Sequence, residues 1–180
     1  MKGGQAMIGF LAGLKRLYNL RDLERRLLLA RVPVNGICVE IGVDRGLHAR
    51  CILDLCIPNL LLLVAPWEGR GVDAVDVTHA FGCGGRTTVA QTTSMNFARY
   101  WTGHPDFVYI DGDHSSPAVR KDVVAWGTLL AAGGVLAGDD YQQPGVRKGV
   151  ADGLRELRVA AGCKMKKVGP WRTQWAVEKM

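Results

Sequence analysis

Short, continuous apolar runs that stop at glycine or aspartate are the feature that most constrains how this chain folds. One run ends in FVYIDGDH at residues 107–114, and another ends in GGVLAGDDY at residues 133–141. Unbroken apolar runs of this length are typical of strands that are buried on both faces, as in a parallel sheet. The sequence therefore predicts a core built around a parallel sheet, with aspartates where its strands end.

The rest of the chain alternates strand-like and helix-like segments, which predicts a Rossmann-like, doubly wound α/β domain with seven strands. The strands are expected at residues 37–41, 60–64, 87–91, 106–110, 135–137, 163–168 and 173–177. Only about four residues separate the last two strands, and a parallel crossover needs more. We therefore expect a mostly parallel sheet with an antiparallel hairpin at its C-terminal edge.

Three of the intervening segments have apolar side chains at helical spacing, with polar residues opposite. Ser116 and Pro117 are expected to cap the second of these helices, with proline at its first position. Residues 1–34, rich in leucine and arginine, predict a helical lead-in that covers part of the sheet, and residues 35–180 form the main domain. The expected apolar faces are Leu47, Cys51, Ile52 and Leu55; Val119, Val123, Trp126 and Leu130; and Val146, Val150, Leu154 and Leu157.

Composition limits the possible partners and location. The formal net charge is +6, but Lys and Arg are spread along the chain, so a nucleic-acid partner is not favoured. No apolar run reaches the roughly 18 residues of a membrane span. Five scattered cysteines indicate buried thiols in a reducing compartment, so we expect a cytoplasmic protein.

The aspartates at the strand ends are candidates for a metal site. In an open α/β sheet the carboxyl ends of the strands border the ligand-binding crevice, so Asp111, Asp113, Asp139 and Asp140 are expected to share one cleft. Crowding raises the free energy of ionised carboxylates unless a cation neutralises them, and Mg²⁺ and Ca²⁺ prefer such oxygens. The alternative for each single residue is structural: Asp113 or Asp140 caps a turn or helix.

A second candidate site follows the first expected strand, where the sequence reads VEIGVDRG at residues 39–46. Glycines in a strand-to-helix turn let the backbone approach a nucleotide-like ligand, and the helix start offers free N–H groups. The spacing of Gly42 and Gly46 departs from the usual dinucleotide fingerprint, and such a loop alone is more often a plain tight turn.

Taken together and in this order, the motifs E-I-G-x-x-x-G, I-D-G-D-H and G-G-V-x-A-G-D-D-Y resemble class I S-adenosylmethionine-dependent methyltransferases. Within that class, the chain is similar to the small metal-dependent O-methyltransferase group related to macrocin and catechol O-methyltransferases. The resemblance covers roughly residues 36–155. It implies an S-adenosylmethionine cofactor, a divalent ion such as Mg²⁺, and methyl transfer to a hydroxyl of a small molecule or sugar.

The resemblance also assigns roles to single residues. Glu40, Gly42 and Gly46 would surround the methionine and ribose end of the cofactor, and Asp111 would lie beside it. Thr93 and Ser94 match the adenine-side segment. Asp111, Asp139 and Asp140 would hold the metal, and Asp113 or His114 would accept the proton, with Asp113 favoured.

One position departs from the family pattern. Trp67 falls where the family often has Asp-Pro-Trp, but here Ala65 replaces the acid that accepts hydrogen bonds from ribose hydroxyls. Glu68 is a candidate substitute. This departure motivates an alternative in which the chain is a catalytically impaired binding or scaffold protein. A metal-dependent hydrolase is a further alternative, and the acceptor pocket is expected to be open or completed by another copy in a homo-oligomer.

Overall fold

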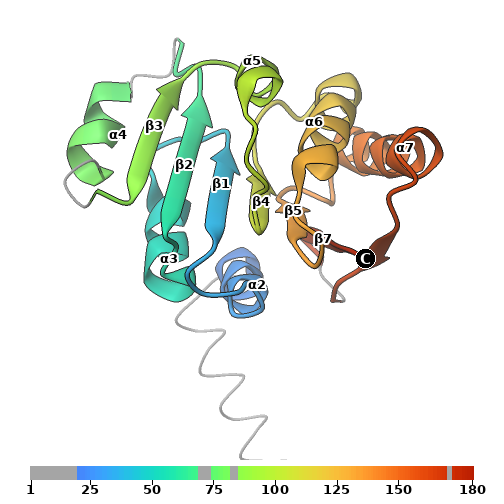
Figure 1. Cartoon of the computed structure of the whole chain (residues 1–180), viewed down its shortest axis with the longest axis horizontal. Helices are drawn as coiled ribbons and strands as arrows, with labels where there is room; N and C mark the ends of the chain where they lie inside the picture. Colours follow the sequence, from blue (N-terminus) through green and yellow to red (C-terminus); the bar gives the residue numbers. More distant parts are fainter. Residues whose placement is uncertain (1–19, 69–73, 82–84, 170–171) are drawn as a thin grey trace, which may run out of the picture.

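The computed structural model describes residues 20–68, 74–81, 85–169 and 172–180. These residues form a seven-stranded sheet with the order β3-β2-β1-β4-β5-β7-β6 (Figure 1). The strands are β1 Ile37–Ile41, β2 Leu60–Ala65, β3 Thr87–Gln91, β4 Phe107–Ile110, β5 Val135–Gly138, β6 Met165–Lys167 and β7 Trp175–Lys179. Strands β1 to β5 are parallel, and β7 is antiparallel to β5 and β6. The predicted fold class and C-terminal hairpin are confirmed.

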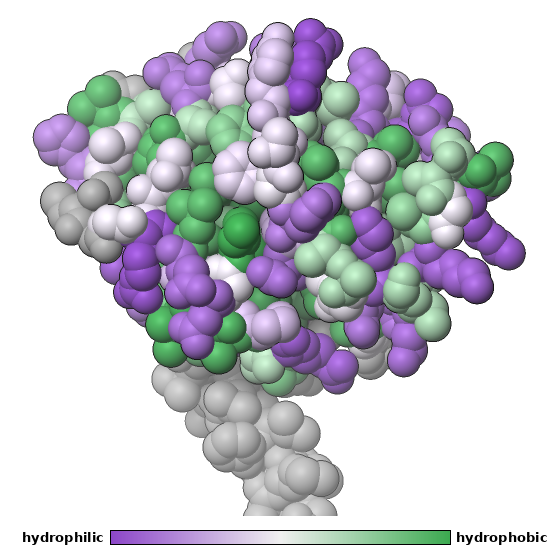
Figure 2. All heavy atoms as spheres, in the orientation of Figure 1, coloured by the Kyte–Doolittle hydropathy of each residue, from purple (hydrophilic) through white to green (hydrophobic). Residues whose placement is uncertain are grey.

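Helices cover both faces of this sheet and divide the core into two layers. One layer packs α2 (Leu20–Leu29), α3 (Leu47–Cys56) and α4 (Ala74–Phe81) against the sheet. The other packs α5 (Ser94–Tyr100), α6 (Ser116–Leu129) and α7 (Pro144–Ala160). In Figure 1, α4 and α7 lie at opposite ends of the molecule. Apolar and hydrophilic side chains are interspersed on the face shown in Figure 2.

The predicted apolar face of α3 is wrong in part. Leu47 is 79% exposed and Leu55 is 37% exposed, whereas His48, Ala49, Ile52 and Cys56 are buried. Leu47 and Leu55 were predicted to be buried because they are apolar, but both lie on the solvent side of the helix. The face that meets the sheet instead combines Ile52, which was predicted, with the smaller Ala49 and Cys56 and the polar His48.

Strand β7 begins and ends two residues later than expected, and a hydrogen-bonded carboxylate explains the later start. Residues Thr173 and Gln174 were expected in the last strand, but their backbone N–H groups donate to Glu24 on α2 at 2.8 and 3.2 Å. Arg172 donates its N–H to the same carboxylate at 2.9 Å, and the Thr173 hydroxyl donates at 2.7 Å. Helix α2 is thereby fastened to the segment that leads into β7.

The predicted N-terminal lead-in is described only from residue 20 on, because residues 1–19 lie outside the described residues. Leu28 and Leu29 of α2 are fully buried in the core. Cys38 and Cys56 are buried, and Cys51 and Cys163 are partly buried. Within the described ranges, none of the helices has the length and apolar character needed to cross a membrane.

The order of the strands reverses beside β1. Strands β2 and β3 lie on one side of it, and β4 and β5 lie on the other. The connections after β1 and β4 therefore leave the sheet in opposite directions, which opens a crevice at their carboxyl ends. This is where the fold positions a binding site.

The hydrogen bonds to Glu24 make a prediction about stability. Burial raises the pKa of Glu24, but the hydrogen bonds from Thr173 and the three N–H groups more than offset this and leave the pKa below 4.5. The ionised form is thus favoured by folding, so its contribution is present above pH 4.5 and is lost as the pH falls further. We expect Glu24→Gln to lower the free energy of unfolding by about 1–3 kcal/mol at pH 7. Urea unfolding measures this.

The difference between Glu24→Gln and the wild-type protein should shrink as the pH falls below 4. Glu156→Gln is the matched control, because Glu156 makes an exposed ion pair with Arg120, and it should change stability by less than about 1 kcal/mol. An unchanged urea midpoint of Glu24→Gln at pH 7 would contradict the assigned role.

Candidate functional site

A cleft of about 480 Å³ opens at the carboxyl ends of β1, β2 and β4. The loops after these strands, the first turn of α5 and the first two turns of α6 form its walls, so the cleft occupies the point where the strand order reverses. Four of the predicted cofactor-binding residues line it, namely Gly42, Trp67, Thr93 and Ser94. The lining consists of Ile41, Gly42, Val43, Val64, Ala65, Pro66, Trp67, Thr93, Ser94, Met95, Gly112, Asp113, Ser115, Pro117, Ala118, Lys121 and Asp122.

Gly42 lets the loop after β1 approach the end of β4. Its φ is +87°, and a Cβ at this position would lie 2.2 Å from the carbonyl oxygen of Asp111. Any larger residue would push the two strand ends apart. Gly46 allows a different close contact, because a Cβ at this position would lie 2.3 Å from the ring of Phe81. Gly46 does not line the cleft.

Trp67 and Ala65 form the wall that β2 contributes. Trp67 has a φ of +52°, unusual for a non-glycine residue, and it is buried with its indole N–H unpaired within the described part of the chain. Ala65 lines the cleft with a methyl group. Glu68 is exposed and does not contribute to the lining. The side chains of the β2 wall are therefore apolar toward the cleft, and the indole N–H of Trp67 is buried.

Thr93 and Ser94 line the cleft from the start of α5. The Thr93 hydroxyl caps this helix by accepting a hydrogen bond from the N–H of Asn96 at 3.3 Å. The Ser94 hydroxyl accepts a hydrogen bond from the indole N–H of Trp126 at 2.8 Å. Both side chains are thus held in place by α5 and α6.

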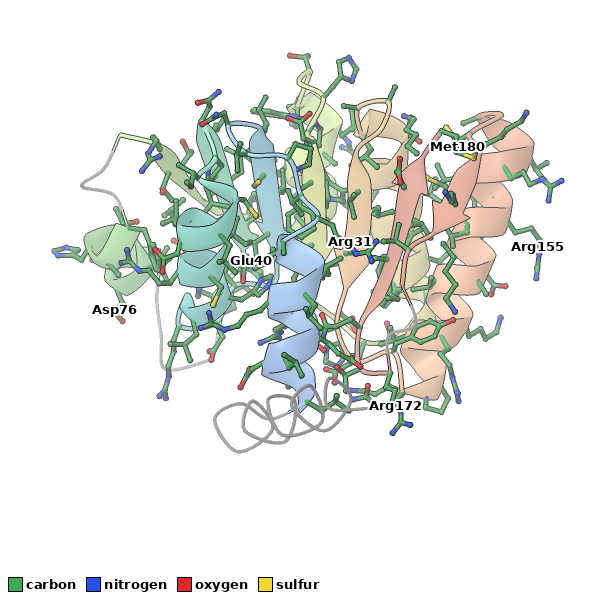
Figure 3. All side chains as sticks on the ribbon, turned by 90° about the horizontal axis from the view of Figure 1, so that it is seen from below. Arg31, Glu40, Asp76, Arg155, Arg172 and Met180 are labelled. Carbon is green, nitrogen blue, oxygen red and sulfur yellow. The ribbon has the colours of Figure 1, made fainter. Side chains whose placement is uncertain are left out.

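Glu40 lies between β1 and α3 rather than in the lining of the cleft (Figure 3). It is 3% exposed, and its Oε1 is 3.8 Å from Nδ1 of His48. His48 in turn packs against Tyr109, with ring centroids 3.9 Å apart and the rings tilted by 35°. Among the described residues, Glu40 Oε2 and both ring nitrogens of His48 have no hydrogen-bond partner.

The predicted metal-binding acids do come together at the ends of β4 and β5. His114 Nε2 lies 3.6 Å from Asp111 Oδ1 and 3.4 Å from Asp140 Oδ2. Donor atoms of these three residues all lie within 4.8 Å of one another. Asp113 points elsewhere: its Oδ1 accepts the N–H of Ser115 at 2.8 Å, as the turn-capping alternative requires, and it lines the cleft.

Two arginines of α2 enter this acidic cluster, and sequence reasoning missed them. Nη2 of Arg25 lies 3.0 Å from Asp111 Oδ2 and 2.5 Å from Asp139 Oδ2. Arg21 also donates to Asp139 Oδ2, and its guanidinium is 3.7 Å from Asp140. Arg21 and Arg25 are four residues apart, so they project from the same side of the helix. The spacing of the two arginines is visible in the sequence, but nothing in the sequence indicates that this side of the helix faces the aspartates at the strand ends.

Asp139 does not fit a metal ligand in this arrangement. Its Oδ2 is occupied by both guanidinium groups, and its Oδ1 accepts hydrogen bonds from Gln174 Nε2 at 2.6 Å and from the Asp140 N–H at 2.8 Å. The side chain has no exposed surface. A role for Asp111 and Asp140, with His114, in holding an ion stays a prediction.

Two carboxyl groups at the site, of the partly buried Asp111 and the buried Asp122, have raised pKa values. Burial, and then the charge of Asp139, raise the pKa of Asp111 to about 6 although Arg25 and Arg21 oppose the shift. Burial also raises the pKa of Asp122 on α6 to about 6, opposed by a hydrogen bond from Ser94. Asp122 was not predicted as a site residue. The sequence feature that could have identified Asp122 is a carboxylate next to the apolar helix face that includes Val119 and Val123.

Comparison with known proteins supports the methyltransferase assignment. The family described as "Methyltransferase domain" matches residues 39–141, which is more than half of the chain. No curated protein sequence gives a significant match.

Many solved structures share the fold at low sequence identity. One is a protein from Streptococcus mutans assigned as a methyltransferase, in complex with SAH, with 12% identity and a TM-score of 0.67 over 91% of this chain and 99% of that one. Another is an rRNA methylase from Streptococcus thermophilus, with 15% identity and a TM-score of 0.63 over 86% and 93%.

A third is an O-methyltransferase family protein from Burkholderia thailandensis, with 14% identity and a TM-score of 0.61. The aligned region covers 99% of this chain but 60% of that one. At these identities the structures establish the fold and leave the acceptor open. With the family match and the strand order, they show that the chain belongs to the methyltransferase domain family, among the class I S-adenosylmethionine-dependent methyltransferases.

Proposed function

We propose that this protein transfers a methyl group from S-adenosylmethionine to a hydroxyl of a small molecule or sugar. The observation that carries the proposal is the cleft at the reversal of strand order, where Gly42 lets the loop after β1 pass close to the backbone at the end of β4. A cleft of about 480 Å³ is within the range of small-molecule sites. The family match supplies the reaction class.

The lining suggests how the cofactor would lie. Gly42 would face the ribose and methionine end, and Thr93 and Ser94 the adenine end. Trp67 would flank the ligand with its side chain. Glu40, with one unpaired buried oxygen beneath the loop, is proposed to balance the ammonium of the methionine part.

S-adenosylmethionine supplies an electrophilic methyl group when bound. In the transfer, an acceptor oxygen forms a bond to the methyl carbon, the carbon–sulfur bond breaks with its electron pair staying on sulfur, and the hydroxyl proton leaves. Asp113 is the favoured proton acceptor because it lines the cleft and only its Oδ1 is engaged by Ser115. His114 is the second candidate, held by Gln143 at 3.2 Å beside Asp111.

The proposal includes no step through a divalent ion. Two guanidinium groups already offset the three carboxylates at the ends of β4 and β5, and Asp139 is fully engaged. Binding of Mg²⁺ or Mn²⁺ at Asp111, His114 and Asp140 is therefore a separate question for experiment. The scaffold alternative is favoured by one observation, the methyl group of Ala65 in place of an acid.

Titration calorimetry with S-adenosylhomocysteine, in Mg²⁺ and in EDTA, tests the cofactor site without knowledge of the acceptor. We expect saturable binding with the same affinity in both solutions, because no residue that lines the cleft belongs to the candidate ion cluster. Absence of binding at millimolar ligand in both solutions would favour the scaffold alternative. Tighter binding in Mg²⁺ would restore a metal to the mechanism.

The charge compensation by Arg25 makes a second prediction. Arg25→Met should lower the free energy of unfolding by about 3 kcal/mol, because Asp111 and Asp139 lose a shared cation. Adding Asp111→Asn should recover part of this loss in a double-mutant cycle. Mn²⁺ should raise the thermal unfolding midpoint of Arg25→Met more than that of the wild-type protein. Arg120→Met, at an exposed ion pair, is the control and should cost less than about 1 kcal/mol.

A wild-type protein that is stabilised by Mn²⁺ as strongly as Arg25→Met would argue against compensation by arginine. The same conclusion would follow if Arg25→Met and Arg120→Met were equally stable.

The proton acceptor can be identified once a screen with labelled methyl donor has found an acceptor. Asp113→Asn should lower kcat by about 10²–10⁴-fold if Asp113 takes the proton. Binding of S-adenosylhomocysteine should change little, since the asparagine retains the side-chain oxygen that caps the turn. A large loss of kcat in His114→Gln, with Asp113→Asn unaffected, would transfer the role to His114.

A further inference from the structure

Gln143 occupies the N-cap of α7 without using its side chain to cap the helix. Its backbone is extended, and Pro144 follows it at the start of the helix. The preferred N-cap residues use a side-chain oxygen to accept a backbone N–H, at a gain of about 1 kcal/mol. Gln143 makes no such bond, and its amide instead lies against His114, with Nε2 3.2 Å from Nδ1 of the ring. The side chain therefore serves the loop after β4 rather than its own helix.

Close packing of α7 fixes this contact. Gly145, Gly149 and Gly153 are four residues apart along α7, so they lie on one side of the helix. A Cβ at Gly145 would lie 2.6 Å from the carbonyl oxygen of His114, and a Cβ at Gly149 would lie 2.8 Å from that of Ser116. Without these side chains, the first turn of α7 can rest directly on the backbone of the loop that carries His114. The glycines thus place Gln143 beside the imidazole ring.

The other ring nitrogen of His114 faces carboxylates. Nε2 lies 3.4 Å from Asp140 Oδ2 and 3.6 Å from Asp111 Oδ1, and both distances exceed the usual hydrogen-bond length of about 2.9 Å. Together with Asp139, three carboxylates share two guanidinium groups of α2, so negative charge is in excess around the ring. This charge stabilises a proton on Nε2 and repels a lone pair there.

These two contacts select one tautomer of the imidazole. If the Gln143 amide N–H donates to Nδ1, the neutral ring of His114 carries its proton on Nε2, toward the carboxylates. If the amide oxygen instead accepted a proton from Nδ1, the lone pair of Nε2 would face two carboxylate oxygens with no proton between them. The first arrangement avoids this repulsion and is favoured. In it, neither ring nitrogen has a free lone pair with which to take a proton from a bound molecule.

We propose that Gln143 is a positioning residue that holds His114 as the Nε2–H tautomer, so that His114 donates a hydrogen bond to the acceptor oxygen and does not take its proton. This inference rests on the proposed function, since the acceptor is the molecule that receives the methyl group. The side chain of His114 is 38% exposed, and Asp113 and Ser115 on either side of it line the cleft. Its N–H is therefore accessible to a bound hydroxyl, and proton transfer falls to Asp113.

NMR of the histidine ring nitrogens, in protein labelled with ¹⁵N-histidine, tests the tautomer without cofactor or acceptor. His114→Gln identifies the His114 signals among those of the four histidines. We expect the wild-type ring at pH 8 to carry its proton on Nε2. Gln143→Glu should invert this preference, because an ionised carboxylate can only accept and so requires a proton on Nδ1. Gln143→Met has a similar length but no donor, and it should lower the preference by about three- to tenfold, which corresponds to one hydrogen bond.

Gln142→Met is the matched control, because Gln142 donates to Asp140 Oδ1 at 2.9 Å rather than to the ring. It should leave the tautomer of His114 unchanged. Gly145→Ala tests the positioning independently, since the added Cβ would move the start of α7 away and should shift the tautomer in the same direction as Gln143→Met. A wild-type ring protonated on Nδ1 or on both nitrogens would overturn the proposal. So would the same tautomer in the wild-type protein, Gln143→Glu and Gln143→Met, which would leave Gln143 a purely structural link.

Steady-state kinetics separate a hydrogen-bond donor from a proton acceptor once a methyl acceptor is known. If His114 only binds the acceptor oxygen, Gln143→Met should raise KM for the acceptor by about three- to tenfold and lower kcat by less. A fall in kcat of about 10²-fold or more at an unchanged KM would show that His114 takes the proton, and it would overturn the proposal.

Calorimetry with S-adenosylhomocysteine distinguishes this inference from the function on which it rests. Gln143 does not line the cleft, so Gln143→Met should bind the ligand as tightly as the wild-type protein. If the wild-type protein binds none, the proposed function fails and the role of His114 toward an acceptor fails with it. If the wild-type protein binds the ligand but its His114 tautomer does not respond to Gln143, the inference alone is overturned.

Discussion

The contact between Arg25 and the two carboxylates of Asp111 and Asp139 is the interaction on which the arrangement of the site depends. Parallel strands end side by side, so β4 and β5 place their acids at the same edge of the sheet, where repulsion must be offset. Arg25 bridges them at 3.0 and 2.5 Å and also donates to the hydroxyl of Tyr109. Glu24, one residue earlier, holds the backbone before β7. Charges of both signs therefore fix α2 to the sheet.

The two aspartates with raised pKa values illustrate why a shifted pKa alone does not assign a role. Asp111 and Asp122 both titrate at about 6, and burial is the main cause for each. Asp111 has two guanidinium groups within 4 Å, which explains it as part of an internal ionic cluster. Asp122 has no salt bridge to an arginine or lysine among the described residues, and it lines the cleft. An acid that the protein itself leaves uncompensated is the stronger candidate for contact with a ligand.

The sheet and the grouping of the acids could be predicted from sequence because both follow from local patterns. Unbroken apolar runs identify buried strands, and the carboxyl ends of neighbouring parallel strands necessarily share an edge. What compensates the acids could not be predicted, because Arg21 and Asp139 are 118 residues apart and no periodic pattern links them. The same limit applies to α3, where the type of Leu47 suggested burial but its place on the helix left it exposed. Long-range pairing decides the first case, and the side of α3 that faces the sheet decides the second.

The residues around the cleft also indicate how recognition is distributed across it. Strand β2 contributes a methyl group at Ala65, where a carboxylate would have accepted hydrogen bonds from a ribose. The acids that line the cleft within the described residues are Asp113 and Asp122, and of these only Asp122 is buried. A buried acceptor discriminates more strongly than an exposed one, because a mismatched ligand leaves it without a hydrogen bond and without water. Under the proposed function, the ribose would be held mainly by the backbone around Gly42, because the wall of β2 offers it no carboxylate.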